Sequence, residues 1–376
     1  MRPASRVLRL ASSVPGRLLN RTLSGVVPPV SPRATALHGT LAVADFHADA
    51  LLWARDLLAR GTWGHVDVPR LIEGRVALQV FTTVTKTPRR MNIESNAGDS
   101  DNITLLAVLE GWPRPARSSL LQRALHQADK LRSFAAGSGG RLTLIRTRSD
   151  LASYLARREN DDAVTAGVLG IEGAHALEGD VANVDRVFRA GFRLLGLTHF
   201  FDNAVGGSAH GVAKGGLTDL GRQVLARMEE LGMVVDLAHA SPALIDDVLA
   251  VATRPVVVSH TGVRGTCDNT RNLDDGRLAA VAATGGVVGI GLWRTAVCGT
   301  SPADWARAVR HAVDVAGVEH VGLGSDWDGA VACMIDASQT VHLVQALLDG
   351  GFADEEVRLI MGANVLRVFS EILPLP

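Results

Sequence analysis

The sequence has little of what marks several large classes of protein. Three cysteines among 376 residues are too few for a disulfide scaffold, and none are spaced as Cys-x-x-Cys, the pattern of a thiolate zinc site. The formal net charge is only -1, so the chain lacks the extended positive field of a nucleic-acid-binding protein. No apolar run approaches the roughly 20 residues that cross a bilayer, so we expect no membrane span. These absences favour a globular protein that acts on small molecules.

Acidic residues are absent from the first part of the chain, where arginine recurs. We interpret residues 1–40 as a basic N-terminal extension that is flexible or peripheral, and residues 41–376 as one domain. A targeting segment and an amphipathic segment packed on the body remain alternatives. The apolar runs are too short for a secretory signal, which favours a cytoplasmic protein. Cys267 and Cys298 are expected to be small buried hydrophobes, whereas a disulfide between them would favour an exported or periplasmic protein.

Short apolar runs alternate with amphipathic helical patterns along the rest of the chain. Because a strand followed by a helix, repeated eight times, is typical of a parallel barrel, we predict an α/β fold of the (β/α)8 TIM-barrel type. The predicted helices include 220–231, 242–252, 274–283 and 302–316. The predicted strands are Leu41–Phe46, Val76–Val84, Ala166–Ile171, Arg193–Thr198, Met233–Leu237, Pro255–Ser259, Gly286–Leu292 and His320–Ser325.

The interval between the second and third predicted strands is long enough to hold a helical insertion. It carries helical patterns over 103–110 and 120–136, and we expect it to form a lid or wall over the barrel mouth. After Ser338 the pattern predicts closing helices, with Leu366, Val368 and Phe369 packed inward.

Residues that bind metals follow several of the predicted strands, at the barrel end where active sites of this fold lie. His47 and Asp49 follow the first strand and share one side of it. Glu172 ends the third strand, where a buried carboxylate needs a partner such as a cation, an arginine or a helix N-terminus. His239 and His260 follow the fifth and sixth strands, and a shared metal explains both. The set suits two Zn²⁺ ions, with Glu172 as the bridge.

Two further polar residues follow other strands. His199 follows the fourth strand and is a candidate to stabilise the oxyanion, although a core histidine would fit the same pattern. Asp326 follows the eighth strand and is a candidate to carry a proton, although a helix N-cap would also fit. We interpret the other histidines, His175 and His210 among them, as ordinary loop, helix or strand-start residues.

The ordered motifs from about residue 42 to residue 369 resemble those of the membrane (renal) dipeptidase family. These motifs are Asp45-Phe46-His47-Ala48-Asp49, Ser95-Asn96 with Asp101-Asn102-Ile103-Thr104, Ile171-Glu172-Gly173, Leu197-Thr198-His199, Asp236-Leu237-Ala238-His239, Ser259-His260, Arg271-Asn272, Gly324-Ser325-Asp326-Trp327-Asp328-Gly329 and Gly362-Ala363-Asn364. Around Trp293, some animal members carry tyrosines near the substrate that this chain lacks, which leaves the side-chain preference open.

The resemblance implies a zinc dipeptidase and assigns the residues to roles. His47 and Asp49 would bind one zinc, His239 and His260 the other, and Glu172 would bridge them and serve catalysis. His199 and Arg271 would contact the substrate, and a guanidinium suits its C-terminal carboxylate. Arg271 could instead tie down its own loop. Asp326 would handle the proton, and the assembly would be a homodimer.

The expected reaction is hydrolysis of L,L and possible L-Xaa-D-Xaa dipeptides by a hydroxide that bridges two zinc ions. One alternative is a binuclear metal amidohydrolase that acts on an N-acyl amino acid, a lactone or a cyclic amide. Such enzymes start with His-x-His and often use a carboxylated lysine, whereas this chain has His47-x-Asp49 and a glutamate. A second alternative is a silent binding protein, which the complete set of ligands disfavours.

Overall fold

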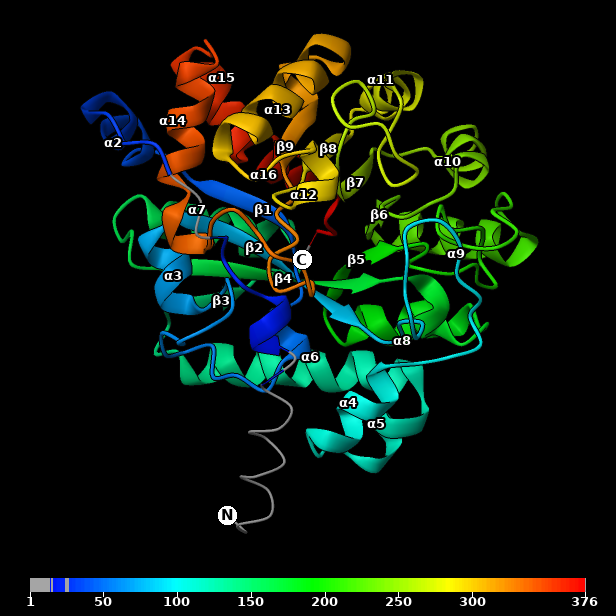
Figure 1. Cartoon of the computed structure of the whole chain (residues 1–376). Coiled ribbons are helices and arrows are strands. Elements are labelled where there is room, and N and C mark those ends of the chain that lie inside the picture. Colours follow the sequence, from blue (N-terminus) through cyan, green and yellow to red (C-terminus); the bar gives the residue numbers. More distant parts are fainter. Residues whose placement is uncertain (1–13, 15, 24–26, 376) are drawn as a thin grey trace.

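A closed barrel of eight parallel strands forms the centre of the structure, a computed structural model that describes residues 14, 16–23 and 27–375 (Figure 1). Going around the ring, β2 pairs with β4 and β1 pairs with β9, which closes the barrel. All eight predicted strands are confirmed, with ends that differ by a few residues. The strands are β1 (Val43–Ala48), β2 (Val76–Val84), β4 (Thr165–Glu172), β5 (Phe192–Gly196), β6 (Val234–Asp236), β7 (Val256–Thr261), β8 (Val287–Ile290) and β9 (Val321–Leu323).

Helices follow the strands and surround the barrel, as the alternating pattern predicted. Their ends follow local sequence signals. The Thr218 side chain accepts a hydrogen bond from Gly221 N at the start of α9, and Gly232 ends this helix at φ 71°. These connecting helices are α3 (Val68–Glu73), α8 (Ala182–Arg189), α9 (Asp219–Leu231), α10 (Pro242–Leu249), α11 (Asp275–Ala283) and α13 (Pro302–Ala316).

The insertion after β2 contains the two predicted helices and three elements that were not predicted. The elements are α4 (Ile103–Leu109), α5 (Arg114–Ser118), α6 (Leu120–Gly137), β3 (Leu142–Leu144) and α7 (Arg148–Arg158). In Figure 1, α6 runs along the lower side of the barrel, with α4 and α5 beneath it. The loop that precedes α4 reaches the loops after β5 and β7, because Asn96 N donates to His210 O at 2.7 Å and Thr270 Oγ1 donates to Ile93 O at 3.0 Å. This loop therefore forms a wall at the carboxyl ends of the strands.

The helices after β9 are α14 (Val341–Asp349), α15 (Asp354–Arg358) and α16 (Asn364–Ile372). Helix α14 packs against α13 in the outer layer, and α16 closes the end of the barrel opposite the carboxyl ends of the strands. Val368 and Phe369 are fully buried as predicted, and Phe369 lies 6.0 Å from Phe46 inside the barrel, whereas Leu366 is half-buried. Gly362 lets the segment before α16 approach the start of β1 closely, because a Cβ at this position would lie 2.0 Å from Ala42 O. Apolar side chains from β1 and α16 therefore fill this end of the barrel.

The described part of the 1–40 segment contacts the body at several places. Helix α2 (Pro32–His38) packs against α14, and Arg33 forms a 2.7 Å ion pair with Asp354. Thr22 forms a β-bridge with Cys333.

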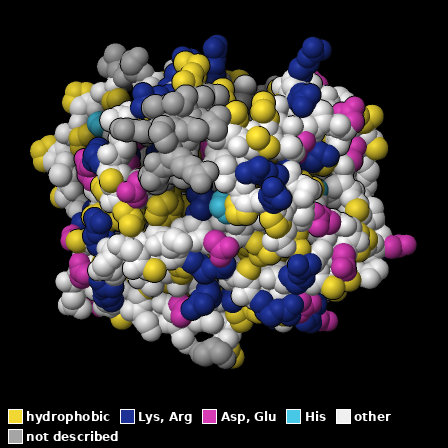
Figure 2. All heavy atoms as spheres, turned by 90° about the horizontal axis from the view of Figure 1, so that it is seen from below, with side chains coloured by type: hydrophobic (Ala, Val, Ile, Leu, Met, Phe, Trp, Pro, Cys, Tyr) yellow, Lys and Arg dark blue, Asp and Glu magenta, His cyan; other side chains and the backbone are white. Residues whose placement is uncertain are grey.

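Basic and acidic side chains lie among each other on the face shown in Figure 2, with hydrophobic side chains scattered between them. Within the ranges that the structure describes, no helix combines the length and the apolar character that a bilayer crossing requires.

Cys267 and Cys298 form a disulfide that joins the loop after β7 to the end of α12 (Arg294–Val297). The expectation that these two cysteines are free buried residues is therefore wrong, and the alternative is confirmed. Strand spacing alone could not decide this, because the two thiols meet through loop paths outside the barrel. Cys333 is free and buried, as expected.

Replacing Cys298 by Ser should lower the free energy of unfolding by about 2–4 kcal/mol, because the bond closes a loop with a sequence separation of 31 and so restricts the unfolded chain. Denaturant unfolding would measure the change, with Cys333→Ala as the control. Denatured, unreduced protein should react with one equivalent of an alkylating reagent. Reaction of three equivalents would show that the disulfide does not form.

Candidate metal centre

The carboxyl end of the barrel gathers the residues that the sequence placed there. His47 lies in β1 and Asp49 directly follows that strand, and His47 Nε2 lies 3.5 Å from Asp49 Oδ1. Glu172 is the last residue of β4, His239 follows β6, and His260 lies in β7. All five side chains are buried.

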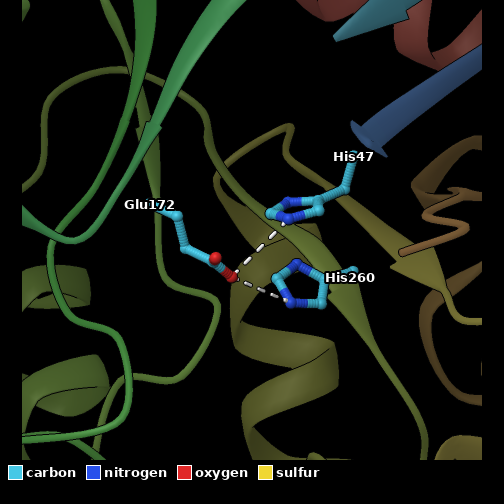
Figure 3. Close-up of side chains that lie close together, drawn as sticks. All are labelled: His47, Glu172 and His260. Atoms are coloured by element: carbon cyan, nitrogen blue, oxygen red, sulfur yellow. Dashed lines mark ion pairs between the residues drawn. The ribbon is translucent and has the colours of Figure 1, made fainter. Parts of the chain in front are cut away.

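Glu172 is the centre of the cluster. Its Oε1 lies 3.5 Å from His47 Nε2, 3.1 Å from His239 Nε2 and 3.5 Å from His260 Nε2. Figure 3 shows its carboxylate pointing toward the imidazoles of His47 and His260. On the other side, Oε2 lies 3.2 Å from His199 Nε2. One carboxylate therefore faces imidazoles that come from four separate strands or the loops after them.

The donor atoms form groups of the size that a metal ion requires. Atoms within 4.8 Å of one another occur in three overlapping sets: His47, Glu172 and His260; Glu172, His199 and His239; and His47, Asp49 and Asp326. His47 Nε2 has no hydrogen-bond partner, although it is buried among these groups. Imidazole nitrogens and carboxylate oxygens are the ligands of catalytic zinc sites. The residues present therefore fit metal ions at this position.

Burial determines the protonation of three of the imidazoles. It lowers the pKa of His199, His239 and His260 well below the usual value, and nearby cationic groups add to the effect. These rings are neutral at physiological pH. A neutral imidazole has the free electron pair that a metal ion needs.

Two carboxyl groups of the cluster have raised pKa values. Burial, with the charge of Asp49, raises the pKa of Glu172 well above its usual value. Burial also raises the pKa of Asp326 to about 7. Burial opposes the charging of His47, but the charges of Glu172 and Asp49 outweigh it and raise its pKa to about 10. The cluster thus contains crowded carboxylates that a cation would stabilise.

Residues behind the cluster hold its side chains in place. Ser259 Oγ lies 2.9 Å from His260 Nδ1 and 3.3 Å from His47 Nδ1, and Ser259 N donates to Asp236 Oδ1 at 2.8 Å. These contacts direct the Nε2 atoms of both rings toward Glu172. Such supporting contacts orient the ligands of metal sites.

The residues assigned to the substrate lie beside the same cluster. Arg271 Nη2 donates to His260 O at 2.6 Å and lies 3.5 Å from His239 Nε2. Burial lowers the pKa of Arg271 to about 10, so it remains charged at neutral pH. Arg271 thus links the loop after β7 to His260, and its charge lies beside the cluster. Asp326 is buried with a carboxylate oxygen within 4.8 Å of a His47 ring nitrogen, and it caps no helix.

The structure adds buried residues that sequence reasoning placed outside the site. His210 is fully buried, stacks on Phe200 at 4.8 Å and lies 5.1 Å from the His239 ring, while its Nδ1 contacts Ile93 O at 2.7 Å. His175 is buried beside Phe201. His210 lies in a turn and His175 lies in a short 3-10 helix, Ala174–Leu177, so strand spacing gave no signal for them.

Trp293 also borders the site. Its ring lies 5.8 Å from the His260 ring and 5.6 Å from the Arg271 guanidinium. The Trp293 ring thus lies beside the Arg271 guanidinium, within the range of a cation–π contact.

Comparisons with known proteins agree with this geometry. A sequence model of the family described as membrane dipeptidase (Peptidase family M19) matches residues 31–374. Dipeptidase verJ of Clonostachys rogersoniana is 30% identical over 315 residues, which cover 82% of this chain and 76% of that protein.

Solved structures show the same fold. A metallo peptidase from Rhodobacter sphaeroides, liganded with a phosphinate mimic of the dipeptide L-Ala-D-Ala, is 25% identical with a TM-score of 0.72, over 89% of this chain and 99% of that chain. The probable dipeptidase PvdM from Pseudomonas aeruginosa is 19% identical with a TM-score of 0.73, over 91% of this chain and 99% of that chain.

Substituting Ser259 by Ala should weaken metal binding by about 10- to 100-fold, because both imidazoles that it orients gain freedom to turn. Competition with a chelator would measure the affinity. Ser241→Ala is the matched control, since this buried serine caps α10 through Leu244 N. Equal affinities in all three proteins would show that Ser259 does not support the ligands.

Proposed function

The chain belongs to the membrane dipeptidase family, and from this premise we propose that it cleaves dipeptides at a centre of two zinc ions. Membership makes the protein a metal-dependent hydrolase that acts on small peptides. The number of metal ions, their identity and the roles of individual residues belong to the proposal. The proposed ligands are His47 and Asp49 for one ion, His239 and His260 for the other, and Glu172 between them.

The position of Glu172 is the observation that carries this proposal. Its Oε1 is within 3.5 Å of nitrogen atoms from His47, His239 and His260, which belong to both proposed ion sites. A carboxylate between two sets of donors is the arrangement that lets one residue bridge two ions. A single structural salt bridge would not need three imidazoles around one oxygen atom.

The residues around the centre divide the chemical work. When bound, zinc supplies an activated water for attack on the peptide carbonyl and a positive charge that polarises that carbonyl. An N–H of His199 stabilises the negative charge that develops on the carbonyl oxygen. The Asp326 carboxylate carries a proton to the nitrogen of the departing amine. Glu172 serves catalysis by holding the two ion sites together.

Recognition of a dipeptide requires a group for its C-terminal carboxylate, and we assign this role to Arg271. Its guanidinium is buried beside His239 and Trp293. A charged hydrogen bond is strong at such a buried position. This contact would favour short peptides, because a longer substrate carries its carboxylate too far from the cleaved bond.

Hydrolysis of L-Xaa-D-Xaa as well as L,L dipeptides remains part of the proposal. It is supported by the family and by the solved relative that binds a mimic of L-Ala-D-Ala. Action on an N-acyl amino acid, a lactone or a cyclic amide is the alternative activity. Assembly as a homodimer is also still a prediction.

The cellular compartment is a prediction as well. The sequence favoured the cytoplasm, with export or the periplasm as the alternative. The Cys267–Cys298 disulfide adds weight to the alternative, because such bonds persist mainly in oxidising compartments.

Purified protein should cleave members of a panel of L,L and L,D dipeptides, lose this activity on chelation and regain it with zinc. His239→Ala should lower kcat/KM by at least about 1,000-fold, because one proposed ion loses a ligand. His311→Ala is the control, since His311 pairs with Asp275 on the outer helices. Metal content per chain would be measured for each protein.

The same panel includes an N-acetyl amino acid, a lactone and a cyclic amide. Cleavage of one of these by the zinc-loaded wild type, with all dipeptides left intact, would replace the dipeptidase proposal by the amidohydrolase alternative.

Arg271→Lys should raise KM for a free dipeptide by about 100-fold, because a lysine cannot form the two-pronged contact with a carboxylate. The matched substrate is the same dipeptide with a C-terminal amide. Wild type should cleave the amide poorly, and the substitution should change its kinetics little. An equal loss on both substrates would contradict the assignment.

A further inference from the structure

The loop that carries Asp326 has an unusual backbone. Asp326, Asp328 and Ala330 all adopt left-handed conformations, with φ values of 58°, 62° and 60°. Residues other than glycine rarely adopt this region, and they remain there only when surrounding contacts hold them. The cause of this conformation must therefore lie in what the loop contacts.

Asp328 provides most of these contacts, and its side chain is fully buried. One carboxylate oxygen accepts a hydrogen bond from His65 N at 2.7 Å, and the other accepts from Val66 N at 3.2 Å and from the Arg55 guanidinium. The backbone of Asp328 is held as well. Its carbonyl oxygen accepts from Trp53 Nε1 at 2.7 Å, and its N donates to His65 Nδ1 at 3.0 Å. All partners come from the segment between β1 and α3.

Arg55 is itself fixed in position. Its guanidinium donates to Trp63 O at 2.9 Å and Val66 O at 3.1 Å, and it lies 4.9 Å from the centre of the Trp63 ring. Gly64 leaves room for it, because a Cβ there would lie 2.2 Å from Arg55 Nη1. The arginine is therefore a rigid, buried partner for Asp328 and not a mobile surface charge.

The N-terminal segment holds the far end of the loop. Ala330 N donates to Asn20 Oδ1 at 2.8 Å. Cys333 N donates to Arg21 O at 3.2 Å, and Leu23 N donates to Cys333 O at 2.8 Å. Both ends of the turn after Asp326 are thus attached to other parts of the chain.

We propose that Asp328 and Arg55 are positioning residues that hold the loop after β9 so that the Asp326 carboxylate faces the metal centre. This inference rests on the proposed function. A carboxylate oxygen of Asp326 lies within 4.8 Å of donor atoms of His47 and Asp49, whereas Asp328 belongs to none of the groups of possible metal ligands. The pair therefore acts on the reaction through Asp326 and does not contact the reacting atoms.

Asp328→Asn should lower kcat on a dipeptide by about 10- to 100-fold, because a displacement of about 1 Å in a reacting group has an effect of this size. KM should change by less than about twofold, and zinc content should stay the same. Arg55→Ala should act in the same direction, and Arg55→Lys should restore part of the loss. The arginine variants keep the test open if Asp328→Asn does not fold.

A double substitution distinguishes a positioning effect on Asp326 from a general loss of stability. In an Asp326→Asn background, adding Asp328→Asn should cause almost no further loss of kcat, because its effect acts through Asp326. Tyr154→Phe is the control. It removes a buried hydrogen bond to Ala77 O, at the start of β2, and should lower stability without changing kcat. Independent losses in the double variant would overturn the proposal.

Hydrogen exchange tests, without any substrate, whether Asp328 and Arg55 hold the loop after β9. Amides of residues 325–333 should exchange faster in Asp328→Asn and Arg55→Ala than in wild type or Tyr154→Phe. Unchanged exchange would overturn the proposal, as would faster exchange with an unchanged kcat. A zinc-loaded wild type that cleaves no dipeptide would refute the proposed function instead. Hydrogen exchange alone would then decide whether Asp328 and Arg55 hold the loop.

Discussion

A buried carboxylate surrounded by imidazoles is the constraint on which the site depends. Glu172 has lost its water shell, and that loss is unfavourable unless charges or hydrogen-bond donors replace the water. His199, His239 and His260 reach it from β5, β6 and β7 or the loops after them, and the barrel brings His47 of β1 to the same place. Burial also keeps His199, His239 and His260 neutral. The fold that brings these side chains together therefore also buries them, and this burial sets their pKa values.

The sequence predicted the barrel and the proposed ligands for a common physical reason. Strands buried on both faces appear as apolar runs, and a polar residue at the end of such a run, such as Glu172 or His260, stands out. The eight strands and the clustering of His47, Asp49, His239 and their partners follow from this contrast. Residue type and strand position predicted that these side chains bind two zinc ions, and the family resemblance assigned each ligand to one of the ions.

What the sequence could not predict lies mostly in irregular segments. His210 reaches the site from a long loop, where spacing carries no information on direction. The short strand β3 pairs only with the start of β4, a contact that depends on tertiary structure. The Cys267–Cys298 bond and the buried Asp328–Arg55 pair join segments whose meeting depends on loop paths. Charged residues such as Arg55 look like surface residues until the whole chain is folded.

Closure of the barrel has a consequence for folding of the chain during its synthesis on the ribosome. Strand β1 pairs with β9 through Asp45 and Leu323, which are far apart in the sequence, and α16 packs into the end of the barrel. An emerging chain therefore exposes an open, curved sheet with unpaired edges for most of its synthesis. Open edges of this kind favour association with other chains. The order of the elements thus leaves the β1 edge that faces β9 unpaired until residues 321–323 have been added.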